Sequence, residues 1–116
     1  TSGLNRCQYC VVAHGAILRI RAKDPLIADQ VAINWRKAPL SARHRAMLDY
    51  AELVALDAEE ITDDDRDGMA AAGFTPDENW DIGAIAAFFG MSNRLVNMAD
   101  IPPNEEFYML GREPRT

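Results

Sequence analysis

The sequence predicts an all-α protein, a compact bundle of about five helices, and three observations lead to that class. Apolar residues recur at helical spacing along most of the 116 residues, and no useful stretch alternates between apolar and polar residues. Residues that favour helix N-caps precede these apolar segments. No glycine-rich phosphate loop interrupts the pattern. The length fits one domain, residues 1–116.

The first expected helix runs to about Ala22 and is almost entirely apolar. Asn5 is the predicted N-cap, with Gln8 completing a capping box three residues later. The second helix is expected to begin at Asp24, which places Pro25 at the first helical position, where proline is tolerated. A helix as apolar as the first is normally buried, so we expect a neighbour to cover it.

Two further helices are predicted from local capping residues. Ser41 caps a helix that ends near Asp57. Thr62 and Asp65 form a capping box for a short helix that stops at Gly73.

The last predicted helix begins with the cap, proline and box partner Thr75, Pro76 and Glu78, and it ends near Asp100. Residues 104–116 form a tail, expected to be an arm onto a neighbouring molecule. The expected inward face of the helix consists of Trp80, Ala84, Ile85, Phe88, Met91, Leu95 and Met98. Asn93 and Asn97, one turn apart on this apolar helix, are expected to be buried hydrogen-bonding residues or interface residues.

Charge and hydropathy narrow the functional classes. The formal net charge is −6, and no cluster of Lys and Arg interleaves with aromatic residues, so nucleic acid and an anionic membrane surface are not expected partners. No apolar run approaches about 18 residues, the length that spans a bilayer. The chain starts at Thr1, and we expect it to be the C-terminal part of a longer protein. The C-x-x-C spacing of its cysteines fits an intracellular redox pair, so we expect a cytoplasmic location.

The candidate site is formed by Cys7, Cys10 and His14, which include both cysteines and one of the two histidines. On a helix, this spacing places the three side chains in one column. An imidazole can take the proton that a thiol loses when it becomes a nucleophile, and its proximity favours Cys10 as the attacking sulfur. Cys7 has a competing claim, because a helix N-terminus also lowers the pKa of a thiol. We favour Cys10 as the attacker and Cys7 as its disulfide partner.

Other interpretations of these residues remain open. Both cysteines are candidates for small core residues, with His14 a hydrogen-bonded core histidine. A structural zinc site needs four ligands, and only His44 or a carboxylate is left for the fourth. Covalent haem attachment needs a histidine directly after the second cysteine, where this chain has Val11. His44 itself is expected to be a surface or cap residue.

Three segments resemble one known family. Residues 7–15, which read C-x-x-C-x-x-x-H-G at the start of an apolar helix, are similar to the motif of the alkylhydroperoxidase D-like, carboxymuconolactone decarboxylase superfamily. Residues 39–51 resemble the following helix of its peroxidase-related branch, and residues 87–95 resemble its last helix. The resemblance covers nearly the whole chain to about Asp100.

The resemblance implies an all-helical, AhpD-like fold completed by homo-oligomerisation or by N-terminal helices that precede Thr1. It also implies reduction of alkyl hydroperoxides by a C-x-x-C dithiol, with no cofactor or metal, and recycling by a dithiol reductant such as a lipoyl-bearing protein. Carried over by position, Cys10 is the peroxidatic cysteine, Cys7 the resolving cysteine and His14 the proton relay.

The chain departs from the family pattern at two points. The relay glutamate that the family carries upstream of its first cysteine has no counterpart among residues 1–6, and Tyr9 replaces a histidine that some relatives carry. The rival interpretation is a catalytically silent oligomerisation or redox-sensing module that has kept the cysteine pair.

Overall fold

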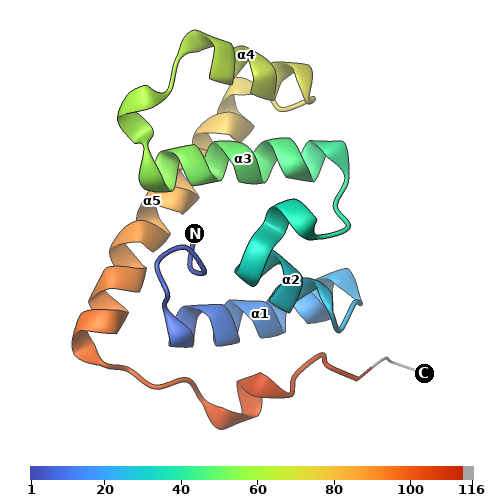
Figure 1. Ribbon diagram of the computed structural model, residues 1–116, viewed down its shortest axis with the longest axis vertical. Helices are drawn as coiled ribbons and strands as arrows, with labels where there is room; N and C mark the ends of the chain where they lie inside the picture. Colours follow the sequence, from blue (N-terminus) through green and yellow to red (C-terminus); the bar gives the residue numbers. More distant parts are fainter. Residues whose placement is uncertain (114–116) are drawn as a thin grey trace. The chain divides into compact units, whose positions relative to one another are not determined.

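The computed structural model describes residues 1–113, which are helical and contain no strand. The prediction of an all-α protein with five α-helices is confirmed (Figure 1). The α-helices are α1 (Gln8–Ala22), α2 (Ile27–Asn34), α3 (Ala42–Leu56), α4 (Asp63–Ala71) and α5 (Pro76–Ala99). Short 3₁₀ helices are η1 (Trp35–Lys37), η2 (Ala58–Glu60) and η3 (Glu105–Tyr108). None of the helices in this part of the chain is long and apolar enough to cross a membrane.

The chain divides into two compact units, described here one at a time. One unit contains Thr1 and residues 40–91, and therefore α3, η2, α4 and most of α5. The other contains residues 2–39 and the chain from Ser92 onward, with α1, α2, η1, the end of α5 and η3. The cysteine motif belongs to the second unit.

Predicted caps start α3 and α5. Ser41 Oγ accepts a hydrogen bond from the His44 amide at 3.1 Å. At the start of α5, Thr75 Oγ1 accepts from the Glu78 amide at 3.1 Å, and the Glu78 carboxylate accepts from the Thr75 amide at 3.2 Å. Each of these bonds satisfies an amide that the helix itself leaves without a partner. The predicted starts of both helices are confirmed.

The short helix α4 also has the predicted ends. The Asp65 carboxylate accepts from the Thr62 amide at 2.9 Å, which completes the predicted capping box. Gly73 follows the helix with a φ of 96°, a backbone conformation in which glycine avoids the steric cost of a Cβ.

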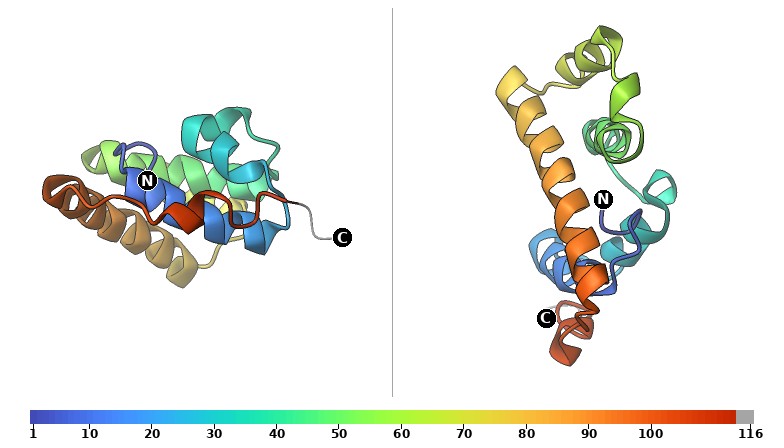
Figure 2. Two further views of the ribbon diagram at one scale, coloured as in Figure 1. Left: turned by 90° about the horizontal axis from the view of Figure 1, so that it is seen from below. Right: turned by 90° about the vertical axis from the view of Figure 1, so that its left-hand side faces the viewer.

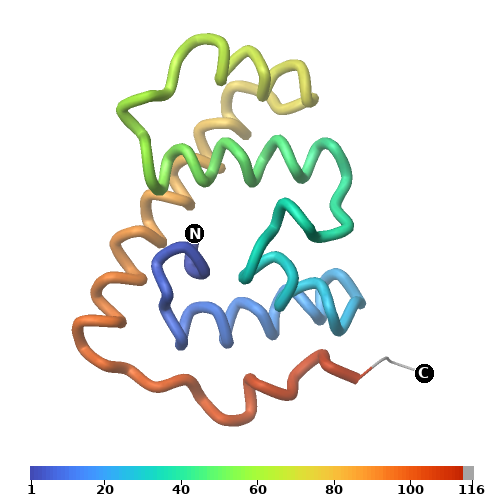
Figure 3. Tube along the Cα trace, in the orientation of Figure 1, coloured from blue at the N-terminus to red at the C-terminus, as the bar shows by residue number. Residues whose placement is uncertain are grey.

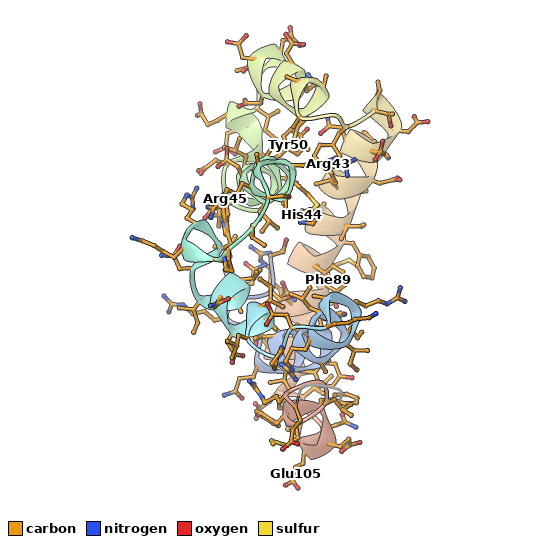
Figure 4. All side chains as sticks on the ribbon, turned by 90° about the vertical axis from the view of Figure 1, so that its right-hand side faces the viewer. Arg43, His44, Arg45, Tyr50, Phe89 and Glu105 are labelled. Carbon is orange, nitrogen blue, oxygen red and sulfur yellow. A yellow bond between two sulfur atoms is a disulfide. The ribbon has the colours of Figure 1, made fainter. Side chains whose placement is uncertain are left out.

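Side chains of α3 hold this unit together, and several are labelled in Figure 4. The Arg43 guanidinium lies 4.2 Å from the centre of the Phe74 ring and pairs with Glu78 at 3.2 Å. Gly83 of α5 faces α3, because a Cβ placed there would lie 3.8 Å from the side chains of both Tyr50 and Val54. The small residue therefore lets α5 approach α3 closely.

In the other unit, α1 contacts α2 and η3, as the lower part of Figure 1 and the left view of Figure 2 show. The predicted start of α2 at Asp24 is wrong, because the helix begins at Ile27 after an N-cap at Leu26. The Asp24 carboxylate instead accepts from the Leu26 amide at 2.8 Å, two residues further on. This side-chain turn uses the capping group before the helix begins.

The tail after α5 is anchored on α1 by Arg19, which is only 2% exposed. Its guanidinium donates to the carbonyl of Leu110 at 2.8 Å and to that of Phe107 at 2.9 Å. Arg112 adds an ion pair with Asp29 of α2 at 2.8 Å. The expected arm, as far as residue 113, therefore lies on its own chain, and residues 114–116 lie outside the described part.

The predicted inward face of α5 is wrong for its large apolar residues. Trp80 is 76% exposed and Met98 is 78% exposed. The buried face carries Ala86 and Asn93 instead, which are seven residues apart and share a side of the helix. Helical periodicity identifies an apolar face, but it does not identify the element that covers it. The other members of the predicted face are also exposed: Ala84, Ile85, Phe88, Met91 and Leu95.

Candidate redox site

The two cysteines form a disulfide across the first turn of α1. Their Cα atoms are 5.3 Å apart, a separation typical of disulfides. Cys7 is 0% exposed and Cys10 is 2% exposed. The structure therefore brings together the sulfur pair that the sequence predicted, and it buries both residues.

Cys7 is also the N-cap of α1, so the prediction of Asn5 as the cap is wrong. The Cys7 Sγ accepts a hydrogen bond from the Cys10 amide at 3.3 Å, the bond that a serine or aspartate oxygen makes at other helix starts. The Asn5 side chain is not available for this role, because its Nδ2 donates to Asn93 Oδ1 at 3.1 Å. The positive end of the helix dipole therefore lies at the Cys7 sulfur and favours its thiolate when the pair is reduced.

His14 lies one helical turn beyond Cys10, as predicted, and its side chain is exposed. Its Nδ1 is 2.9 Å from the backbone carbonyl oxygen of Cys10. A carbonyl oxygen only accepts hydrogen bonds, so this contact requires the proton on Nδ1 and places the lone pair of the neutral ring on Nε2. The ring is thereby held at the backbone carbonyl of Cys10.

Residues from the end of α5 fix the turn before Cys7, which is the dark blue curl ahead of α1 in Figure 3. Asn93 is 0% exposed, and its Nδ2 donates to Ser2 Oγ at 3.0 Å. Asn97 Nδ2 donates to the Asn5 carbonyl at 3.1 Å. The expectation of a buried hydrogen-bonding residue is confirmed for Asn93, whereas Asn97 forms its hydrogen bond from an exposed position. Their partners could not be inferred from local sequence.

The second histidine, His44, is far in the sequence from Cys7, Cys10 and His14. His44 is the third residue of α3, and it is exposed, as predicted for a surface or cap residue. Among residues 1–113, no three or more His, Cys, Asp or Glu side chains are grouped as they would be around a metal ion.

These features define an all-helical protein with a C-x-x-C disulfide at a helix N-terminus and a histidine one turn later. No protein-family model and no curated protein matches the chain. The solved structures that match it include two crystal structures of proteins described as peroxidase-related.

The first matching structure is described as the alkylhydroperoxidase AhpD core of an uncharacterized peroxidase-related protein from Ralstonia eutropha JMP134. It shares 52% sequence identity with a TM-score of 0.96, over 98% of this chain and 60% of that one. The second is an uncharacterized peroxidase-related protein from Silicibacter sp. TM1040, with 39% identity, a TM-score of 0.93, and coverage of 96% and 58%. Over nearly its whole length the chain is similar to these AhpD-like, peroxidase-related proteins, as predicted, and it spans about 60% of the length of the first.

Proposed function

We propose that this chain reduces alkyl hydroperoxides through a dithiol–disulfide cycle of Cys7 and Cys10. The observation that carries the proposal is the disulfide at the helix start, where Cys7 both caps α1 and bonds to Cys10. The description of the two similar proteins as peroxidase-related supports the same class of reaction.

In the proposed cycle, the Cys10 thiolate attacks the peroxide oxygen of ROOH. The O–O bond breaks, Cys10 becomes a sulfenic acid, and the departing alkoxide takes a proton to give ROH. The Cys7 thiolate then attacks the Cys10 sulfur, which forms the disulfide and releases hydroxide, protonated to water. An external dithiol, such as a lipoyl-bearing protein, returns two electrons and two protons by thiol–disulfide exchange.

His14 is the proposed proton relay for the first step. Its Nδ1–H is held by the Cys10 carbonyl, so Nε2 of the neutral ring can take the thiol proton and later supply it to the alkoxide. The contact with the Cys10 backbone keeps the ring on the side of the helix that carries Cys10.

Burial of both cysteines limits the substrates that fit this proposal. A peroxide must approach sulfur atoms of residues that are 0% and 2% exposed. Small hydroperoxides need less movement of the surrounding residues than bulky ones, so we propose small alkyl hydroperoxides as the substrate class.

The proposal is tested by counting thiols in the reduced protein. One equivalent of tert-butyl hydroperoxide should oxidise both thiols much faster than it oxidises free cysteine. Dihydrolipoamide should then restore both thiols. A catalytically silent module would react no faster than free cysteine, and that result would reject the proposal.

Replacement of His14 with alanine should slow peroxide consumption by about 10²-fold, the usual effect of losing a general acid–base group. The disulfide and the helix should remain, because the His14 side chain is exposed and its bond to the Cys10 carbonyl is not part of the backbone ladder of α1. Stopped-flow kinetics measure the rate, and His44→Ala, at the other histidine, is the matched control. Equal rates for both variants would exclude His14 from the relay.

We also propose that the chain works as a homo-oligomer in the cytoplasm. Large apolar side chains are exposed on α5, including Trp80 and Met98, and such surfaces mark association sites in many proteins. A C-x-x-C cycle also needs a compartment that supplies reduced dithiols. Sedimentation velocity should show a species larger than the 116-residue monomer, and a monomer at all concentrations would contradict the oligomer.

A further inference from the structure

We infer that Asn93 is a positioning residue for the Cys7 sulfur, acting through the turn formed by residues 2–6. This inference rests on the proposed function and assigns the residue to one step of it, the attack of Cys7 on the oxidised Cys10. Asn93 touches neither sulfur in the described contacts, and its effect passes through hydrogen bonds of the turn.

The first link is the amide of Asn93, which is fully buried and bonded on both sides. Its Oδ1 accepts from Asn5 Nδ2 at 3.1 Å, and its Nδ2 donates to Ser2 Oγ at 3.0 Å. The Ser2 carbonyl in turn accepts the backbone N–H of Cys7 at 3.2 Å. One side chain of α5 is therefore connected through one residue to the backbone of Cys7.

The second link is the shape of the turn itself. Arg6, directly before Cys7, has a φ of 53°, a conformation that costs free energy for any residue with a Cβ. Such a conformation persists only when neighbouring contacts determine it. The contacts available are the Arg6 amide bond to the Gly3 carbonyl at 3.2 Å and the bond from Asn97 to the Asn5 carbonyl at 3.1 Å.

The other side of the turn is fixed by Gly3. A Cβ at this position would overlap the backbone carbonyl oxygen of Ala32 in α2, so only glycine fits without movement of the backbone. The turn is thus held between α2 on one side and the asparagines of α5 on the other. Its last residue is followed by Cys7, whose sulfur must reach the Cys10 amide and the Cys10 sulfur.

These contacts act on Cys7 and not on Cys10, whose backbone belongs to α1. Loss of the Asn93 bonds should therefore leave the attack of Cys10 on peroxide unchanged. It should slow the following attack by Cys7, because the proximity of the two sulfurs is no longer enforced. It should also shift the dithiol–disulfide equilibrium toward the dithiol.

The test compares Asn93→Leu with Asn79→Leu, the same substitution on the same helix. Asn79 is a suitable control because its Oδ1 is buried and accepts no hydrogen bond from residues 1–113. Reduced proteins are mixed with one equivalent of tert-butyl hydroperoxide in the presence of dimedone, and trapped sulfenic acid is measured by mass spectrometry. Equilibration with dithiothreitol buffers measures the equilibrium constant of the pair.

For Asn93→Leu we expect sulfenic acid trapping to rise on the order of 10-fold, since small displacements of reacting groups cost at least this much. The disulfide equilibrium constant should fall about tenfold, which corresponds to about 30 mV. Asn79→Leu should match the wild type in both measurements. A purely structural role for Asn93 predicts no change in either measurement for folded protein, and that result overturns the inference.

A milder variant, Ser2→Ala, serves if Asn93→Leu does not fold by circular dichroism. It removes only the acceptor of the Asn93 amide group, and it should shift both measurements in the same direction by a smaller factor. Asn93→Asp is a second mild variant. Wild-type sulfenic acid trapping and a wild-type disulfide equilibrium constant in both folded variants, Ser2→Ala and Asn93→Asp, would overturn the inference. If the wild type itself does not consume peroxide, the proposed function fails, and the equilibrium measurement still decides the role of Asn93.

Discussion

Replacement of Cys10 with serine is expected to abolish peroxide consumption, whereas Cys7→Ser should react once and then stop. In the first variant the attacking sulfur is absent, so only the background rate remains. In the second, Cys10 is oxidised normally, but no neighbouring thiol condenses with the sulfenic acid. Peroxide consumption and dimedone trapping, followed in parallel, distinguish the two outcomes.

The same experiment decides between the two claims to the attacking role. The cap position favours the thiolate of Cys7. The proposed proton relay by His14, whose Nδ1 contacts the Cys10 carbonyl, favours Cys10. If Cys7→Ser loses all activity and Cys10→Ser yields the trapped sulfenic acid, the roles are reversed. Equal residual turnover in both variants would refute a cycle that uses one attacking and one resolving sulfur.

Replacement of Arg19 with leucine should release the tail and lower the free energy of unfolding by about 3 kcal/mol, since each hydrogen bond from a charged donor contributes about 1.5–3 kcal/mol. In this variant the carbonyls of Phe107 and Leu110 lose their hydrogen-bond donor. Burial lowers the pKa of Arg19 from its usual value, and the guanidinium still donates to both carbonyls. Urea unfolding measures the stability. Hydrogen exchange should show faster exchange for amides of η3.

The matched control for this prediction is Arg21→Leu, two residues along the same helix. Arg21 is exposed, and exposed substitutions usually change stability by less than about 0.5 kcal/mol. Equal effects of the two variants would show that Arg19 does not hold the tail. Gly111→Ala is an independent check that the tail packs on α1, and it should also lower the free energy of unfolding. The added Cβ would lie 2.9 Å from the Cβ of Arg19, at a residue whose φ is 74°.

Helix starts were predictable where the capping group and its partner are close in the chain. Ser41 and Thr75 satisfy amides three residues away, so their sequence patterns contain the whole interaction. The prediction failed at Asn5 and Asp24, where the capping side chain has another partner. Asn5 bonds to Asn93, 88 residues away, and no local pattern contains that information.

The candidate site divides in the same way. Cys7, Cys10 and His14 lie within about two helical turns, so spacing alone predicts that they are neighbours. The structure joins the two sulfurs and places His14 Nδ1 at the Cys10 carbonyl. Asn93 was recognisable only as a polar residue in an apolar helix, because its role depends on how distant segments meet. The exposed apolar face of α5 illustrates the same limit, since periodicity does not specify which surface covers it.

The Cys7 sulfur, at the start of α1, is both half of the disulfide and the acceptor that caps the helix. As half of a disulfide it is a weak, neutral acceptor for the Cys10 amide, and as a thiolate it is a negatively charged one. Reduction therefore cuts a covalent link and, at the same moment, strengthens the electrostatic hold on the first turn. We therefore expect the first turn of α1 to stay ordered in both the disulfide and the dithiol form, so that the proposed redox cycle needs no unwinding of the helix.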